Sequence, residues 1–405
     1  MKKSIFLALT TLCFGMSLQE AIETALSHSP TLQAQKLAVK MQKEQKEAVK
    51  AKSYGQVDIN GAYNHYNVPR TLKPLTPPIT PGITTSKDIT SLGGRYSVAL
   101  FKGFADLAQI EVAKLSAQKM EIGYKLTKEE LIYNIKALYF KALGLKESEK
   151  ATDAHIKALK SLYEAVKKEV ALGKRPPLEK LKIKSSLLGV ESKKISIQNA
   201  IQAIKAHLSA LIGAPFDAFA KAKESLKRQN STPYLIKEYY LDVRKSKKEL
   251  KKAKSLYYPK LFLDANYAKN FAKGEDEEVW QASLALNYTL FDFGYKSHTY
   301  QKAKIASMIA KKRFNAKKER LYADIKEAFL QRDTLIKNLN SLRVNLKLLK
   351  KIEEIEKIKY TTGRSEVDDY LSAIANTKEA QSRIASTTYE LYTKEAYINY
   401  LKAGE

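Results

Sequence analysis

The side chains best suited to catalysis or metal binding are scattered along this chain of 405 residues. No two histidines have metal-ligand spacing, and no Walker, G-x-S-x-G or H-E-x-x-H pattern occurs. The sequence therefore predicts neither an enzyme nor a bound cofactor or metal. The five histidines are His28, His65, His155, His207 and His298.

Two glycines and a pair of acids remain of interest. Gly173 and Gly363 fit tight turns, because glycine adopts positive φ freely, and each also fits the C-cap of a helix. Asp368 and Asp369 follow the second glycine closely. Their simplest interpretation is that they solvate the start of a helix, where the helix dipole favours negative charge.

These residues belong to a duplicated chain whose halves are displaced by 190 residues. A constant offset indicates two copies of one structural unit. We place a signal peptide at 1–16, a first repeat at 17–230 and a second repeat at 231–405. The matching segments are Leu100–Phe104 with Leu290–Gly294, Gly173 with Gly363, and Leu181 with Leu371.

The first residues are typical of a secretory signal. Lys2 and Lys3 precede an apolar run, Ile5–Phe14, which is too short to span a bilayer. Cys13, the single cysteine, lies in this run, so we expect an exported chain without disulfides. No later run of about 18 apolar residues occurs, so no spanning helix is expected. An exported protein can still enter a membrane as a β-barrel.

The formal charge of +28 could indicate nucleic-acid binding. However, the lysines are interleaved with glutamates, as in Lys350–Lys357, which is typical of solvated coiled-coil faces. Together with the export signal, this pattern favours a protein that binds no nucleic acid.

Two stretches predict very long helices. No proline lies between Pro81 and Pro176 or after Pro259. Residues 105–172 and 295–360 are rich in strong helix formers, and each would be about 100 Å long. Helices of this length must pack against each other in a rod or tube. A 4-3-4-3 spacing of leucines marks a coiled-coil seam at Leu335, Leu339, Leu342, Leu346 and Leu349.

Four short segments alternate instead with period two, at about 56–66, 91–101, 260–268 and 280–290. One face is apolar with aromatic residues near its ends, and the other is mostly polar or small, as in transmembrane barrels. An ordinary half-buried sheet is the alternative. Four strands cannot close a barrel, so a barrel requires an oligomer. The connections 69–86 and 270–279, the latter with acidic residues 275–278, are predicted to be exposed loops.

Four motifs in order on this duplicated frame resemble the TolC family of trimeric outer-membrane channel proteins over nearly the whole mature length. The opening Ser17–Pro30 is similar to the family's first helix, and Leu290–Gly294 to its passage from strand to long helix. The other two motifs are Leu208, Leu211–Gly213 and Pro215, which resemble the end of the first repeat, and Gly363, Asp369, Leu371 and Ala373, which resemble a helical-hairpin tip.

The resemblance implies a mainly α fold with a small β part. Three chains would form a 12-stranded barrel in the outer membrane, continued across the periplasm by a tunnel of long antiparallel coiled-coil helices. The homotrimer would be a passive exit duct for efflux or type I secretion, contacting outer membrane lipid, a periplasmic adaptor protein and an inner-membrane pump. A periplasmic coiled-coil scaffold without a barrel is the alternative; it explains the helices but not the duplicated strands.

The resemblance also implies a gate at the periplasmic tip. Asp369 matches a position in the family's aspartate ring, and Glu179 and Tyr360 match positions that link the closed helices. The family's arginine falls at Ser365 here, so Arg364 is our candidate substitute. Asp368 is an additional acid, whereas Ser372 replaces a second family aspartate. Gly173 and Gly363 would contact the adaptor.

Overall fold

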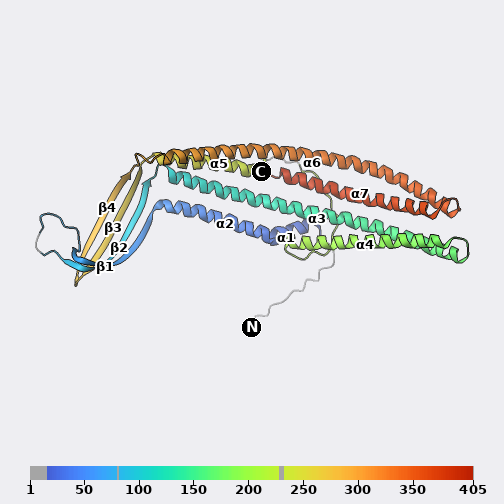
Figure 1. Ribbon diagram of the computed structural model, residues 1–405, viewed down its shortest axis with the longest axis horizontal. Coiled ribbons are helices and arrows are strands. Elements are labelled where there is room, and N and C mark those ends of the chain that lie inside the picture. The colour runs from blue at the N-terminus through green and yellow to red at the C-terminus, as the bar shows by residue number, and fades with distance from the viewer. Residues whose placement is uncertain (1–15, 80–81, 228–231, 405) are drawn as a thin grey trace, which may run out of the picture. The chain divides into compact units, whose positions relative to one another are not determined.

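The computed structural model describes residues 16–79, 82–227 and 232–404 (Figure 1). All of the expected signal peptide except Met16 lies outside these ranges. The described chain is mainly helical, with one four-stranded antiparallel sheet. The predicted fold class is confirmed.

The helices reproduce the duplication in their lengths. The two longest have 67 residues each, the two that follow them have 36 each, and both pairs begin 190 residues apart. The predicted limits of the long helices are correct to within one residue. The helices are α1 (Leu18–His28), α2 (Pro30–Ala51), α3 (Ala105–Ala171), α4 (Pro177–Ile212), α5 (Tyr234–Lys254), α6 (Tyr295–Thr361) and α7 (Val367–Lys402), and short 3-10 turns cover Lys52–Tyr54 and Ser255–Tyr257.

Local sequence explains where the helices begin and end. Ser17 and Glu20 form a capping box that starts α1. Pro177 occupies the first turn of α4, where its missing N–H is tolerated. Gly213 ends α4 in the left-handed conformation, with φ of 75°. A Cβ there would lie 2.7 Å from the carbonyl oxygen of His28, so only glycine fits this turn.

The four strands pair in chain order. They are β1 (Gln56–Thr71), β2 (Thr85–Phe101), β3 (Lys260–Ala272) and β4 (Glu275–Asn287). The predicted loop at 270–279 is wrong, because the strands continue to a two-residue turn at Lys273 and Gly274, both at positive φ. The fourth strand also ends at Asn287 rather than at residue 290. The first connection is shorter than expected as well, since Thr71 pairs with Thr85.

Opposite charges explain why the acidic segment 275–278 is strand rather than loop. The ammonium group of Lys269 forms ion pairs with Asp276 and Glu278 across the hairpin. Glu277 lies 2.8 Å from the amine of Lys73, which belongs to the other hairpin. Cross-strand pairs of opposite charge stabilise a sheet, so the run of carboxylates does not repel the strand away from it.

The chain divides into two compact units, each of which takes segments from both halves of the sequence. Among the described residues, one unit contains 16–36, 124–227, 232–236 and 318–404, and the other contains 37–79, 82–123 and 237–317. The second unit holds the whole sheet.

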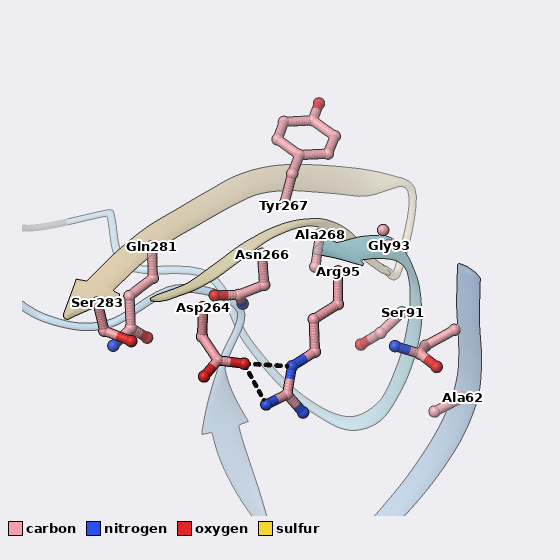
Figure 2. Close-up of a pocket in the computed structure, with 12 residues that line it drawn as sticks. Ala62, Ser91, Gly93, Arg95, Asp264, Asn266, Tyr267, Ala268, Gln281 and Ser283 are labelled. Atoms are coloured by element: carbon pink, nitrogen blue, oxygen red, sulfur yellow. Dashed lines mark hydrogen bonds and ion pairs between the residues drawn. The ribbon is translucent and has the colours of Figure 1, made fainter. Parts of the chain in front are cut away.

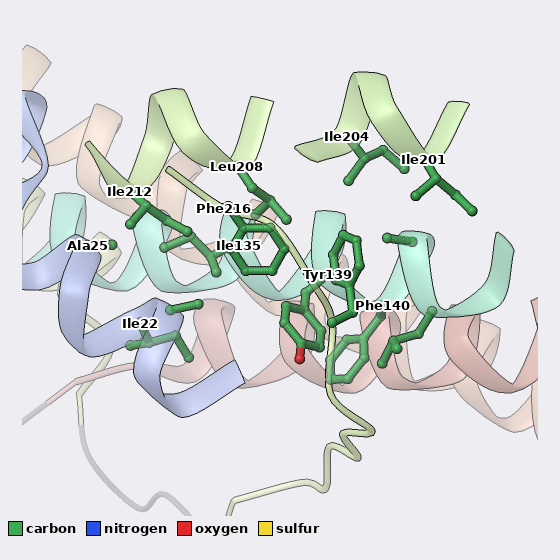
Figure 3. Close-up of a cluster of buried hydrophobic side chains, with 14 of the residues drawn as sticks. Ile22, Ala25, Ile135, Tyr139, Phe140, Ile201, Ile204, Leu208, Ile212 and Phe216 are labelled. Carbon is green, nitrogen blue, oxygen red and sulfur yellow. The ribbon is translucent and has the colours of Figure 1, made fainter. Parts of the chain in front are cut away.

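The core of the first unit surrounds Tyr139 and Phe140 on α3, which are fully buried (Figure 3). Ile22 and Ala25 of α1 and Leu208 and Ile212 of α4 belong to the same cluster. The hydroxyl of Tyr139 accepts a hydrogen bond of 2.8 Å from the backbone N–H of Ala220 and lies 2.9 Å from the carbonyl oxygen of Met16. This buried hydroxyl is therefore satisfied.

The two faces of the sheet differ in chemistry, as the alternation predicted. One face carries apolar side chains that are exposed in the chain, including Ile59 at 83% and Trp280 at 76%. The other carries amides, hydroxyls and charges, among them Asn60, Arg95 and Asp264. Nothing in the described chain covers the apolar face.

A register shift moves Phe101 from one face to the other. The pairing of β2 with β3 slips between Ala99 and Phe101, so Phe101 lies opposite Leu261. Leu261 in turn pairs with Leu286, and both belong to the apolar face. A one-residue bulge thus places Phe101 at the end of the apolar face.

Among the residues that the structure describes, no helix is both long and apolar enough to cross a membrane.

Candidate functional site

Two helical hairpins end close together in the first unit. One turns at Gly173 between α3 and α4, the other at Gly363 between α6 and α7, with φ of 71° and 70°. Both glycines are exposed, and a Cβ at either position would meet no atom within 4 Å. They are therefore needed for backbone conformation and not for close packing within the chain.

A small apolar cluster joins the two hairpins just behind these turns. Val166 of α3, Ile183 of α4, Tyr360 of α6 and Val367 of α7 are nearly fully buried against one another. Each helix contributes one member, so the cluster holds all four chain segments at fixed separation. We refer to it, with the polar groups around it, as the tip.

Tyr360 and Glu179 form a direct link between the hairpins. The hydroxyl of Tyr360 donates a hydrogen bond of 2.8 Å to Oε2 of Glu179. Burial, with this hydrogen bond to a carboxylate as the second cause, raises the pKa of Tyr360 above its ordinary value. The phenol therefore stays protonated, and remains a donor, throughout the physiological pH range.

Arg175 strengthens this link from the turn of the first hairpin. Its guanidinium group donates 3.1 Å hydrogen bonds to Oε2 of Glu179 and to the backbone oxygen of Tyr360, and it also pairs with Glu169. It lies 4.0 Å from the ring centroid of Tyr360, within cation–π distance. The planar group thus contacts a carboxylate, a carbonyl and an aromatic ring on two hairpins at once.

The two aspartates lie in the first turn of α7 and have separate partners. Asp368 forms an ion pair with Lys182 of α4, a second link between the hairpins. Asp369 lies 3.2 Å from the hydroxyl of Ser365, which is also 3.0 Å from a carboxylate oxygen of Glu356. The hydroxyl of Ser365 has one proton and can donate it to only one of these carboxylates at a time. Asp369 forms no ion pair within the described chain, so its negative charge is not neutralised by a cation there.

The structure brings Glu179 and Tyr360 together, as the sequence suggested, but does not bring Arg364 to them. Arg364 is exposed, and its side chain forms no ion pair or hydrogen bond within the described ranges. Arg175, two residues after Gly173, is the arginine that contacts Glu179 and Tyr360.

Sequence reasoning missed Arg175 and Lys182, although a signal for both was present. Arg175 lies two residues after Gly173, and the offset of 190 makes it the counterpart of Ser365. Lys182 is likewise the counterpart of Ser372. The arginine of the tip therefore lies in the first repeat, and the second repeat has serine at the corresponding position.

A second candidate surface lies on the polar face of the sheet (Figure 2). Nε and Nη2 of Arg95 donate hydrogen bonds of 3.0 and 2.5 Å to one carboxylate oxygen of Asp264 on the next strand. Around this pair is a shallow hollow of about 450 Å³, open to solvent. Its other polar lining groups are Asn60, Ser91, Asn266, Gln281 and Ser283.

The hollow presents hydrogen-bonding groups but no catalytic arrangement. It holds no histidine or cysteine, and its single carboxylate is paired with arginine. In the described parts of the chain, no group of three or more His, Cys, Asp and Glu residues is placed to hold a metal ion.

Comparison with known proteins gives a consistent result for the sequence and for the fold. The model of a family described as outer membrane efflux protein matches residues 21–214 and 235–401. No match was found among curated protein sequences.

Three solved structures show the same fold at low sequence identity. CusC, in structures concerned with folding and transmembrane channel formation, has 14% identity and a TM-score of 0.85, covering 96% of this chain and 92% of its own. The outer membrane protein VceC of Vibrio cholerae has 18% identity and a TM-score of 0.81, with 96% of each chain covered. The outer membrane channel MtrE of Neisseria gonorrhoeae, in its open state, has 16% identity and a TM-score of 0.80, covering 96% and 89%.

Proposed function

Because the chain belongs to the outer membrane efflux protein family, we propose that it forms the exit duct of a tripartite efflux or type I secretion system. The protein is an efflux channel component of the outer membrane with its helices in the periplasm. In the proposed assembly, three chains form a passive duct that a periplasmic adaptor connects to an inner-membrane pump.

The observation that carries this proposal is the two-faced sheet. Its apolar face, with Val57, Ile59 and Leu284 exposed, is suited to contact with lipid tails, because uncovered apolar patches of this kind mark interaction surfaces. Its opposite face, which carries Arg95 and the neighbouring amides, is suited to a water-filled lumen. A scaffold confined to the periplasm would leave the apolar face in water.

The edges of the sheet require further copies of the chain. β1 and β4 are the first and last strands of an open sheet, so each has a row of unpaired backbone groups. In hydrocarbon such groups must be paired, and pairing β1 of one chain with β4 of the next closes a barrel. Three chains would supply 12 strands, comfortably more than the roughly eight that a closed barrel needs.

The tip is the proposed gate. The links from Tyr360 to Glu179, from Arg175 to the backbone oxygen of Tyr360, and from Lys182 to Asp368 hold the two hairpins together in each chain. Separating the hairpins would break all of these contacts, so we propose that they stabilise a closed state. The open state described for MtrE supports a duct of this fold that has more than one state.

Assembly gives the first prediction. The protein extracted from outer membranes in mild detergent is expected to be a homotrimer, because the open edges β1 and β4 cannot remain unpaired in a bilayer. Native mass spectrometry and light scattering measure the number of chains. A stable monomer with an intact sheet would contradict the barrel and favour the periplasmic scaffold.

The connection between β1 and β2 gives the second prediction. Replacing residues 73–83 with Asn-Gly is expected to leave the yield of trimer nearly unchanged, since this dipeptide favours a tight hairpin turn. The buried cluster of Leu72, Ile89 and Ala272 at the base of the hairpin is retained. The partly exposed ion pair of Lys73 with Glu277 is lost, and ion pairs near the surface contribute under about 1 kcal/mol.

The matched control is the same shortened chain carrying Leu72→Asn, which places an amide in that cluster and should lower the yield. Trimer yield on a native gel measures both variants. Loss of trimer from the first variant alone would show that the connection takes part in assembly rather than forming an external loop.

A further inference from the structure

A basic hollow lies where the strands β2 and β3 pass into the helices α3 and α5, within the sheet-containing unit. It has a volume of about 400 Å³. Phe104, Leu107 and Tyr258 form its apolar wall, and Lys248, Lys251 and Lys254 line it from α5. Phe104 and Leu107 are 59% and 63% exposed, although both are apolar.

The hollow belongs to the apolar side of the sheet rather than to the polar side. The ring of Phe101, which the register shift places on the apolar face, packs edge-on against Phe104 at 5.1 Å between centroids. Phe104 in turn packs edge-on against Tyr258 at 6.1 Å. These three rings continue the apolar face of the strands directly into the wall of the hollow.

The position of Phe104 is determined by the backbone. Gly103 and Phe104 both have positive φ, at 61° and 69°. A Cβ on Gly103 would lie 2.6 Å from the carbonyl oxygen of Ser255, so the chain can make this turn only with glycine. The turn holds the exposed ring beside the lysines instead of letting it fold into the helices.

The lysines give the hollow a net positive charge. Lys248 lies 3.4 Å from Glu111, the one carboxylate in the lining. Lys251 and Lys254 are exposed and form no ion pair within the described part of the chain. Two uncompensated ammonium groups therefore stand beside an aromatic wall at the end of a lipid-suited surface.

We propose that this hollow binds the headgroup of an anionic phospholipid from the leaflet that faces the periplasm. The phosphate would pair with Lys251 and Lys254, while the beginning of the acyl chains would lie against Phe104 and Leu107. Aromatic rings at the level of the headgroups and lysines just outside the hydrocarbon are the arrangement expected at a membrane interface. The proposal rests on the proposed insertion of the sheet in a membrane.

The charge of the site identifies the occupant. A zwitterionic headgroup offers no net charge to two ammonium groups, and a protein partner would have to reach a hollow bordered by the bilayer. An anionic lipid supplies both the phosphate and the apolar chains, from a surface where its local concentration is high.

The test uses the intact oligomer in nanodiscs made with phosphatidylglycerol or phosphatidylcholine. Lipids that remain bound on release from the disc are counted by native mass spectrometry. Wild-type protein is expected to retain phosphatidylglycerol, up to one per chain, in preference to phosphatidylcholine. Losing one lysine near a membrane surface weakens binding of an anionic lipid about fivefold, so Lys251→Gln/Lys254→Gln is expected to weaken this retention about 25-fold.

Lys245→Gln/Lys252→Gln is the matched control, since it removes the same charge from another side of the same helix. Lys252 lines a separate hollow with Lys52 and Lys102 rather than the aromatic wall. The control should retain phosphatidylglycerol like the wild type.

Equal losses in both double variants would overturn the proposal, because retention would then reflect overall charge. Displacement of the lipid by millimolar inorganic phosphate would also overturn it and indicate a site for free anions. Failure of the chain to insert as an oligomer at all would instead contradict the proposed function, so the two failures are distinguishable.

Discussion

Channels carrying Tyr360→Phe and Glu179→Gln together are expected to open far more often than the wild type in planar bilayers. The pair of changes removes the hydrogen bond from Tyr360 to Glu179, which links the two hairpins, and the ion pair of Glu179 with Arg175 within the first hairpin. A hydrogen bond to a charged group contributes about 1.5 kcal/mol or more. If three chains open together, the ratio of open to closed channels rises on the order of a thousandfold.

The expected observation is a higher mean conductance without a change in ion selectivity, because the aspartates of α7 are untouched. Single-channel recording measures both quantities. In whole cells the same variant should admit large antibiotics that the wild type excludes.

Tyr163→Phe with Glu164→Gln is the matched control. It removes the same hydroxyl and the same charge close to the tip. Within the described chain Glu164 forms its ion pair with Lys167 on its own helix, so no link between the hairpins is lost. Unchanged conductance in the Tyr360 and Glu179 variant, with an intact trimer, would show that the tip contacts support the hairpins without gating them.

The second large effect concerns ion selectivity. In the proposed trimer, replacing Asp368 and Asp369 with asparagine removes up to six negative charges while keeping side-chain size. Rings of carboxylates in narrow pores attract cations and bind multivalent ones. Cation preference should therefore fall, and block by trivalent cations added on the periplasmic side should disappear, as measured by reversal potentials and block in bilayers.

The partners of the two aspartates predict unequal single effects. Asp368 is paired with Lys182, so its charge is largely compensated, whereas the polar partner of Asp369 in the described chain is the uncharged hydroxyl of Ser365. Asp369→Asn alone should therefore reduce trivalent block much more than Asp368→Asn alone.

Asp324→Asn with Asp333→Asn is a suitable control, because it removes two aspartates per chain from α6 at a distance. Asp333 lies about 40 Å along the helix from Tyr360. If the double change at 368 and 369 leaves selectivity and block like those of this control, the two acids only solvate the start of α7.

The long helices could be predicted from sequence because local rules decide them. Absence of proline, strong helix formers and glycine at residues 173 and 363 place the ends of α3 and α6 to within one residue. The hairpin of β3 and β4 could not be predicted in the same way. The acidic residues 275–278 predict a loop, because the local sequence does not reveal that Lys269 and Lys73 lie opposite them. Lys73 is about two hundred residues away along the chain.

The residues of the candidate site likewise divide into those that the sequence could identify and those that it could not. Tyr360 and Glu179 could be identified because the resemblance assigned positions relative to glycine, and the structure places them 2.8 Å apart. The spacing of Arg175 from Gly173 was a usable signal, but its hydrogen bond to the backbone of Tyr360, 185 residues further along the chain, could not be foreseen from that spacing. Phe101 could not be assigned to the correct face, because alternation cannot reveal a bulge between paired strands.

The equal lengths of corresponding helices constrain how such a chain can evolve. A deletion confined to α3 would withdraw the turn at Gly173 by about 1.5 Å per residue while leaving Gly363 in place. A single lost heptad would separate Glu179 from Tyr360 by roughly 10 Å, more than either side chain can span. A change of length confined to one repeat is therefore expected to break the tip contacts, whereas equal changes in both repeats would keep them, so the length of the proposed duct depends on the two repeats together.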